Sequence, residues 1–239
     1  ILIRLAPDEH AIFWMPHSIV WDGWSFDLLL HEMSSHYRAA IEGRTGALPP
    51  LPIQYADFSA WQNARVERGD FDGQLAYWRH RLARPIASLG LPTDRERSPT
   101  LGYEGARVSS RIDGPLLEAI RGLARVEGVT TYMVLLAALD ALLYRYSGVR
   151  DVLVASPLQG RLHPELENLV GLFVNTLFFR TRVEPDLSFQ GLLHRVRDTC
   201  LEAVQHQDAP SELVIEAMEE GGFDRSPYEM IFIYQQATG

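Results

Sequence analysis

Residues 15–25 read Met-Pro-His-Ser-Ile-Val-Trp-Asp-Gly-Trp-Ser, and this stretch decides how the sequence on either side is interpreted. The apolar run at residues 11–15 ends at Pro16, which predicts a buried strand before the stretch. Ser25 is a residue type that caps helices, and apolar residues recur after it at helical spacing, so a helix is expected to begin there. A loop between a strand and a helix that holds His, Asp and Gly is a platform for chemistry, although His-x4-Asp-Gly alone is a weak signal.

Outward from this stretch, predicted helices and strands follow one another in a mixed order. Further helices are expected over residues 53–68 and 72–83, after the capping residues Asp113 and Ser188, and starting at Thr130 and Ser211. Further strands are expected over residues 106–112, 152–155, 172–183 and 228–235. Residues 85–105 are rich in Pro and Gly and are the candidate linker. This order predicts an α/β or α+β fold with layered sheets.

The composition is that of an acidic globular chain. The 239 residues are 46% hydrophobic and 22% charged, which suffices for one large domain or two small ones. A formal net charge of −9 without a basic run argues against nucleic acid or an anionic membrane as the partner. All 22 basic residues are arginine, which fits either a GC-rich genome or selection for bidentate anion contacts. A local arginine patch can still dock an acidic protein.

The cysteines and histidines of the sequence limit which disulfides and metal sites can be expected. Cys200 is the single cysteine, so no internal disulfide can form, which fits a reducing cytoplasm. The histidines outside the motif lack metal-ligand spacing, and no Gly-rich phosphate loop is present, so no metal or nucleotide is expected. No signal peptide or membrane span is expected either. The chain opens inside one apolar run and stops just after another, so we expect it to be an internal piece of a larger protein.

Six segments, in family order over residues 11–235, resemble the motifs of condensation domains of nonribosomal peptide synthetases. These domains share a superfamily with chloramphenicol acetyltransferase, and their signature is His-His-x-x-x-Asp-Gly. One match would be weakly specific, whereas six in order are very specific. His206–Pro210 departs from its motif, because Ser211 follows where Phe is usual. The matching segments are residues 15–25, Ile53–Trp61, Ser156–Arg161, Val170–Arg180, His206–Pro210 and Phe223–Pro227.

The resemblance implies a chloramphenicol-acetyltransferase-like, two-lobed, V-shaped fold with mixed sheets covered by helices, incomplete at both ends. Residues 1–84 would form the C-terminal part of the first lobe, 85–105 the linker between lobes, and 106–239 an incomplete second lobe. Peptidyl or aminoacyl carrier domains would deliver a donor thioester and an acceptor amine to a tunnel on phosphopantetheine arms. A neighbouring adenylation domain and a cytoplasmic location are also implied, and no directly bound cofactor.

The Asp-Gly pair sets the register of the signature. His17 matches the first His, whereas Ser18 falls on the second, catalytic His, which in the family contacts the acceptor amine. In the family pattern Asp22 bridges to an arginine of the second lobe, and Arg161 is the match. Gly23 would permit the turn and let the backbone approach a ligand closely.

Four further residues belong to the matched motifs, and each has two readings. Trp21 and Trp24 either line the tunnel or pack within the lobe. Asn175 and Thr176 either hold the crossover between the lobes or pair with a neighbouring strand in the ordinary way.

The serine at position 18 is the departure that matters. A hydroxyl is a very weak base and is shorter than imidazole, and losing positioned acid–base help costs about 10²- to 10⁴-fold in rate. Ser18 could instead be a nucleophile, but His17 beside it points the opposite way on extended backbone. A shifted loop could also let His17 take over as the base.

Three functions therefore stay open. The first is an acyltransferase with weakened amide formation. The second is a non-catalytic interface domain that recruits a tailoring hydroxylase or oxygenase to a carrier-bound amino acid. The third is an ordinary enzyme in which serine was introduced to trap a complex.

Overall fold

The computed structural model describes residues 1–46, 48–83, 86–94, 105–219 and 228–235. The chain divides into two compact units, residues 1–71 with 158–175, and residues 72–157 with 176–239. The lobe division expected from the sequence, at residues 84 and 106, differs from this division and stays a prediction. Much of the expected linker and the Phe223–Pro227 segment lie outside the described residues.

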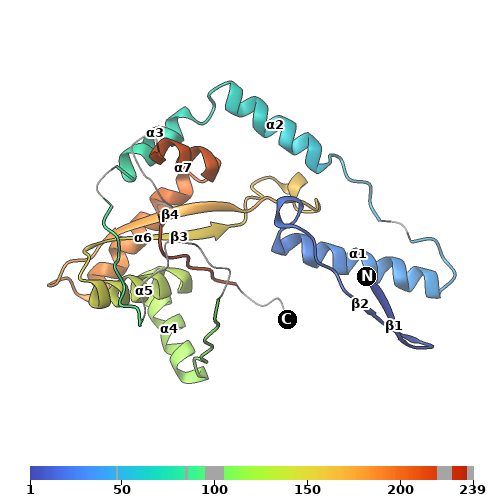
Figure 1. The fold of residues 1–239 in the computed structure, drawn as a ribbon, viewed down its shortest axis with the longest axis horizontal. Helices are drawn as coiled ribbons and strands as arrows, with labels where there is room; N and C mark the ends of the chain where they lie inside the picture. Colours follow the sequence, from blue (N-terminus) through green and yellow to red (C-terminus); the bar gives the residue numbers. More distant parts are fainter. Residues whose placement is uncertain (47, 84–85, 95–104, 220–227, 236–239) are drawn as a thin grey trace. The chain divides into compact units, whose positions relative to one another are not determined.

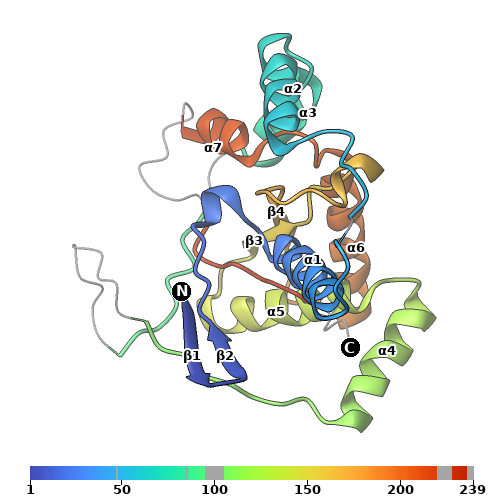
Figure 2. The same cartoon turned by 90° about the vertical axis from the view of Figure 1, so that its right-hand side faces the viewer.

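The first unit begins with an antiparallel hairpin of β1 (Leu2–Ala6) and β2 (Glu9–Ile12), in blue in Figures 1 and 2. Pairing runs from Leu2 opposite Ile12 to Ala6 opposite Glu9, with an irregularity between Arg4 and Ala6. The buried strand predicted over residues 11–15 was wrong, because pairing ends where Phe13 donates to the Ile1 carbonyl. Phe13, Trp14 and Met15 are exposed beyond it.

Among the described residues, two helices and two short 3₁₀ turns complete the first unit. Its elements are η1 (Ser18–Val20), α1 (Gly23–Ile41), α2 (Tyr55–Glu67) and η2 (Pro164–Leu166). Asp22, and not Ser25 as predicted, is the N-cap of α1: its carboxylate accepts from the Ser25 N–H at 2.9 Å. Gln54 caps α2 in a capping box with Asp57. The helix predicted over 53–68 is therefore confirmed with slightly shorter bounds.

The core of the first unit forms where α2 meets the segment that leads towards β4. Leu166, Leu169 and Phe173 are buried there, and Leu51, Ile53, Tyr55 and Phe58 pack against them. The Phe173 ring lies 5.2 Å from the Tyr55 ring and 4.8 Å from the Phe58 ring, centroid to centroid. Aromatic contacts of this kind add to the free energy gained from burying apolar area.

The second unit holds a small sheet and five helices among the described residues. Its elements are α3 (Asp72–Arg81), α4 (Gly114–Glu127), α5 (Thr131–Ser147), β3 (Asp151–Leu158), β4 (Asn175–Arg182), α6 (Phe189–Gln205) and α7 (Ser211–Glu219). β3 is hydrogen-bonded to β4 and carries an isolated parallel bridge from Ala155 to Ile231. α5 packs on α4 and α6, and α3 packs on α7, as both views show (Figures 1 and 2).

Local signals predicted most helix starts in this unit. Asp113, Thr130 and Ser188 each accept a hydrogen bond from the backbone of the first helical turn, as expected. Gly148 ends α5 in the left-handed conformation at φ 71°. The fully buried side chains of the unit include Trp78, Leu136, Val152, Val154, Phe178, Leu193 and Val196.

Two predicted strands of the second unit were wrong. Residues 106–112 are exposed and have no regular structure, because no described strand pairs with them. Residues 228–235 form no regular strand, and their pairing with β3 is an isolated bridge at Ile231. In the described part of the chain, no single helix is long and apolar enough to cross a bilayer, although α4 and α5 together, bent by 104°, reach that length and composition.

Candidate functional site

The motif loop begins with a 3₁₀ turn that His17 caps. The His17 Nδ1 accepts a hydrogen bond from the backbone N–H of Ile19 at 3.1 Å. Because a backbone N–H can only donate, Nδ1 must be the unprotonated nitrogen, and the ring proton of neutral His17 is on Nε2. His17 is exposed and holds the turn in place, with its Nδ1 lone pair already engaged.

Ser18 is the first residue of this turn. It is exposed, and within the described residues no hydrogen bond is recorded for its hydroxyl. Its carbonyl accepts from the Trp21 N–H at 3.4 Å. A serine nucleophile needs an adjacent base, and neither His17 nor another base of the described residues is hydrogen-bonded to this hydroxyl.

Asp22 is the centre of a dense hydrogen-bond network. Its Oδ2 accepts from Arg161 Nη1 at 2.5 Å and from the Phe173 N–H at 3.1 Å. Its Oδ1 accepts from Arg161 Nη2 at 3.2 Å, and from the Ser25 N–H and Oγ at 2.9 and 2.8 Å. The side chains of Asp22 and Arg161 are only 1% and 4% exposed, so this is a buried bidentate ion pair. The structure thus brings together the two residues that the sequence placed in one bridge.

The ionisation of Asp22 follows from these contacts. Burial alone raises the pKa of the carboxyl, but the hydrogen bonds from Arg161, Ser25 and the Phe173 N–H together hold the pKa below its ordinary value. All five donors favour the carboxylate form. Asp22 therefore stays charged near neutral pH and does not act as a proton carrier.

Arg161 makes further contacts that fix its position. Its Nη2 donates to the Leu169 carbonyl at 3.0 Å. Its guanidinium lies 4.3 Å from the centroid of the Phe173 ring. The attraction of this guanidinium for the carboxylate and the ring face is stronger than at the surface, because water screens it less.

Ser25 and Trp24 have structural roles that the sequence did not reveal. Ser25 is fully buried, and its Oγ accepts from the Gly171 N–H at 3.0 Å. The Trp24 Nε1–H donates to the Glu167 carbonyl at 2.7 Å. The first turn of α1 therefore holds the segment 161–173 through Asp22, Trp24 and Ser25. A Ser three residues after a helix cap was the available signal, but its partner is 146 residues away.

The remaining predicted site residues lie around this network or beyond it. Trp21 is half-buried and packs with Trp14 and Phe26 at ring distances of 5.9 and 6.5 Å. Gly23 is the first residue of α1 and has no positive φ, so the turn conformation expected for it was wrong. Asn175 and Thr176 are the first two residues of β4, and both are half-buried. The first unit ends at Asn175, and the second unit continues from Thr176.

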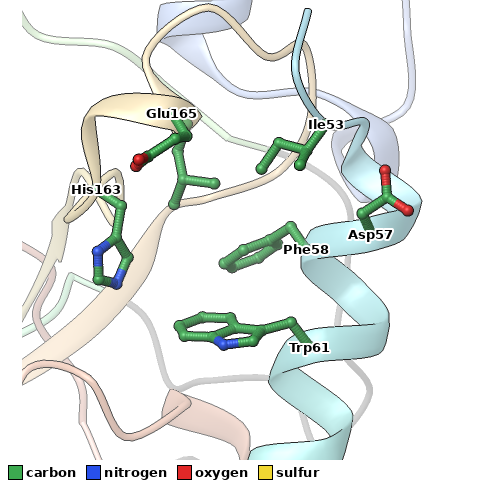
Figure 3. A pocket seen from close by; sticks show the side chains of 7 residues that line it. Ile53, Asp57, Phe58, Trp61, His163 and Glu165 are labelled. Atoms are coloured by element: carbon green, nitrogen blue, oxygen red, sulfur yellow. The ribbon is translucent and has the colours of Figure 1, made fainter.

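A separate pocket of about 340 Å³ lies between α2 and η2 within the first unit. The Phe58 and Trp61 rings project from α2 towards His163, and Glu165 lies beside it (Figure 3). The Trp61 and His163 rings meet edge to face at 5.5 Å. Asp57 is occupied by the capping box, where Oδ2 accepts from the Gln54 N–H at 2.8 Å. Among the described residues, no three His, Cys, Asp or Glu side chains gather as they would around a metal ion.

Comparison with known proteins identifies the family. The family model described as "Condensation domain" matches residues 1–235. The chain is 40% identical over 236 residues to malpibaldin synthetase of Mortierella alpina, covering 98% of the chain and 4% of that protein. The chain thus spans a small part of the length of this curated relative.

Solved structures give the same fold. The X-domain from teicoplanin biosynthesis matches with a TM-score of 0.81 and 27% identity, over 90% of this chain and 49% of that one. A complex of the X-domain and OxyB from teicoplanin biosynthesis matches with a TM-score of 0.77 and 27% identity, over 85% of this chain and 46% of that one. The residues that match the family model include the whole motif loop and both residues of the buried ion pair, Asp22 and Arg161. The chain belongs to the condensation-domain family of nonribosomal peptide synthetases.

Proposed function

We propose that this chain belongs to a condensation domain in which amide formation is impaired because Ser18 occupies the position of the second signature histidine. The observation that carries the proposal is the contrast within one loop. The Asp22–Arg161 pair that supports the loop is complete and buried, while position 18 presents an exposed hydroxyl. The scaffold of the site is kept, and its acid–base group is not.

The reaction in question joins two carrier-bound substrates. The amine of an acceptor attacks the thioester carbonyl of a donor, a C–N bond forms, the C–S bond breaks, and the amine proton leaves as the thiolate takes one up. Both substrates would arrive on phosphopantetheine arms of carrier domains, with an adenylation domain as neighbour and no other cofactor. A base within hydrogen-bond reach of the amine accelerates this step about 10²- to 10⁴-fold.

His17 is not a substitute base in this arrangement. The lone pair of Nδ1 is engaged by the Ile19 N–H at 3.1 Å, and Nε2 carries the proton of the neutral ring. Freeing Nδ1 would break the hydrogen bond that caps the 3₁₀ turn. Position 18 therefore has no neighbour on the loop that restores proton transfer.

A carrier-loaded condensation assay tests the proposal. In the polypeptide that carries this sequence, Ser18→His is expected to raise the rate of amide formation about 10²- to 10⁴-fold. Ser34→His is the matched control, because Ser34 is an exposed serine on α1 outside the site. Equal turnover of Ser18→His and the unmodified protein would contradict the impairment.

The second candidate is an interface domain that recruits a tailoring oxygenase or hydroxylase to a carrier-bound amino acid. It is favoured by the likeness to the teicoplanin X-domain, of which one solved structure is a complex with OxyB. This function needs no base at position 18. Titration of the protein with candidate tailoring oxygenases separates the two: binding that Ser18→His leaves unchanged, with no turnover in either form, supports the interface function.

A further inference from the structure

A second pocket, of about 520 Å³ and with a polar lining, lies in the second unit and shares no residue with the motif loop. Four arginines from three elements line it, against two carboxylates. Two positive charges are therefore in excess, although the formal net charge of the chain is −9. The charged lining residues are Arg81, Asp151, Arg180, Arg182, Glu184 and Arg195.

In one half of this pocket the charged side chains are hydrogen-bonded to one another and to the backbone. Both oxygens of Asp151 accept from Arg180, at 2.5 to 3.0 Å. The Arg81 Nη2 donates to the Arg180 carbonyl at 2.7 Å and to Thr199 Oγ1 at 3.0 Å. These contacts link α3 to β4 and α6, and they hold the walls of the pocket in place.

The other half keeps unused donors. Arg182 Nε and Arg195 Nη2 face the two oxygens of Glu184 at 3.4 and 3.6 Å, which is ion-pair distance but longer than a good hydrogen bond. The Arg195 Nη1 donates to the Arg182 carbonyl at 2.7 Å, so the two arginines are held together. In the described part of the chain, no hydrogen bond is recorded for the Nη groups of Arg182, and the buried Arg81 Nε has no partner.

We infer that this pocket binds a phosphate group, with Arg182 and Arg195 as its principal ligands. Guanidinium groups match phosphate oxygens with paired N–H donors, and two excess charges in a recess attract a dianion. Glu184 lies where such an anion would sit and competes with it. The phosphate could be free or the ester of a small metabolite, since the donors recognise only the phosphate oxygens.

Calorimetric titration with inorganic phosphate at constant ionic strength tests the inference. The unmodified protein is expected to show saturable binding. Arg182→Gln and Arg195→Gln should each weaken it about tenfold, because each removes charge-assisted hydrogen bonds. Glu184→Gln should tighten it several-fold by removing the internal competitor. Arg182 is 68% exposed, so its substitution does not threaten folding.

The matched control is Arg197→Gln. Arg197 lies on the same helix, two residues after Arg195, with the same exposure of 35%, but it pairs with Asp198 and does not line the pocket. Its substitution should leave phosphate affinity within about twofold. Equal weakening by Arg197→Gln and Arg195→Gln, or no saturable binding at tens of millimolar phosphate, would overturn the inference. Glycerol 3-phosphate that binds more tightly than phosphate would identify an ester as the ligand, and equal affinity would identify the free ion.

Discussion

Ser25 and Gly171 lie 146 residues apart in the sequence and contact each other through the buried Ser25 hydroxyl. The Gly171 N–H donates to Ser25 Oγ at 3.0 Å, and the same Oγ lies 2.8 Å from Asp22 Oδ1. The hydroxyl therefore joins the cap of α1 to the chain that enters β4. This contact and the Asp22–Arg161 pair both support the motif loop.

Ser25→Ala is expected to lower the free energy of unfolding by about 1–3 kcal/mol, because the buried Gly171 N–H and Asp22 oxygen lose a partner. Urea denaturation at neutral pH measures the difference. Ser34→Ala, on an exposed position of the same helix, is the control and should stay within about 0.5 kcal/mol. Equal effects of the two substitutions would argue against the joint role of Ser25.

Asp22→Asn is expected to cost about 3–5 kcal/mol at pH 7, because it leaves Arg161 buried without its counter-charge. The folded-state pKa of Asp22 lies below its ordinary value of 3.8, so the unmodified protein keeps this stability above pH 4 and loses it as the pH falls further. Unfolding free energies of the two proteins should therefore converge in acid. Asp27→Asn, an exposed carboxylate on α1, should show neither effect.

Asp140→Asn is expected to stabilise the protein at neutral and alkaline pH. Asp140 on α5 is 1% exposed, and no hydrogen-bond partner of its carboxyl is found among the described residues. Burial raises its pKa to about 8, and the nearby Thr181 hydroxyl, which forms no regular hydrogen bond with it, opposes only part of the rise.

The raised pKa of Asp140 determines how the stability gained by Asp140→Asn changes with pH. Between the ordinary value of 3.8 and about 8, folded Asp140 binds a proton that the unfolded chain has released. Its contribution to the free energy of unfolding therefore falls by up to about 1.4 kcal/mol per pH unit. The gain from Asp140→Asn should grow from pH 5 to pH 8 in urea titrations. Asp186→Asn, at an exposed turn, serves as the control, and parallel pH profiles of Asp140→Asn and the unmodified protein would contradict the assignment.

Gly160→Ala is expected to destabilise the first unit by about 1–3 kcal/mol or more, because the added Cβ would overlap the backbone carbonyl of Phe173. Gly23→Ala is the matched comparison, since its Cβ would meet nothing within 4 Å and alanine favours a helix. Thermal unfolding should separate the two variants clearly. Equal unfolding midpoints would mean that the backbone around Gly160 shifts to accommodate the Cβ without loss of stability.

Gly23→Ala also separates a role in folding from a role in binding. If the backbone at Gly23 approaches substrate, Gly23→Ala should lower the turnover of the Ser18→His protein without lowering its unfolding free energy. The condensation assay and urea denaturation of the same samples provide both measurements. Unchanged turnover would remove Gly23 from the set of residues that face substrate.

Local signals in the sequence predicted the helices well. Helix caps act within three or four residues, so Asp113, Thr130, Ser188 and Gly148 could be read directly from neighbouring residue types. The same reasoning misplaced the start of α1. Both Asp22 and Ser25 are capping residue types, and the choice depended on Ser25 being buried against Gly171.

Strands were predicted less well, because a strand exists only where another strand pairs with it. The alternating pattern of residues 106–112 has no described partner and forms no strand, whereas β3 and β4 pair with each other. The apolar residues 13–15 likewise stay outside β2. An apolar pattern records that a segment can be buried, and pairing decides whether it becomes a strand.

The amino-acid sequence by itself determined the family, the order of the motifs and the serine at position 18, because these depend only on residue identity and spacing. Only the tertiary structure decided that His17 caps a turn through Nδ1, that Ser25 joins the Asp22–Arg161 network, and that Arg182 and Arg195 converge on one pocket. These contacts join atoms that lie far apart along the chain, or depend on which ring nitrogen faces a backbone N–H. Their geometry is set by the packing and hydrogen bonding of the folded chain, and neighbouring residue types along the sequence do not reveal it.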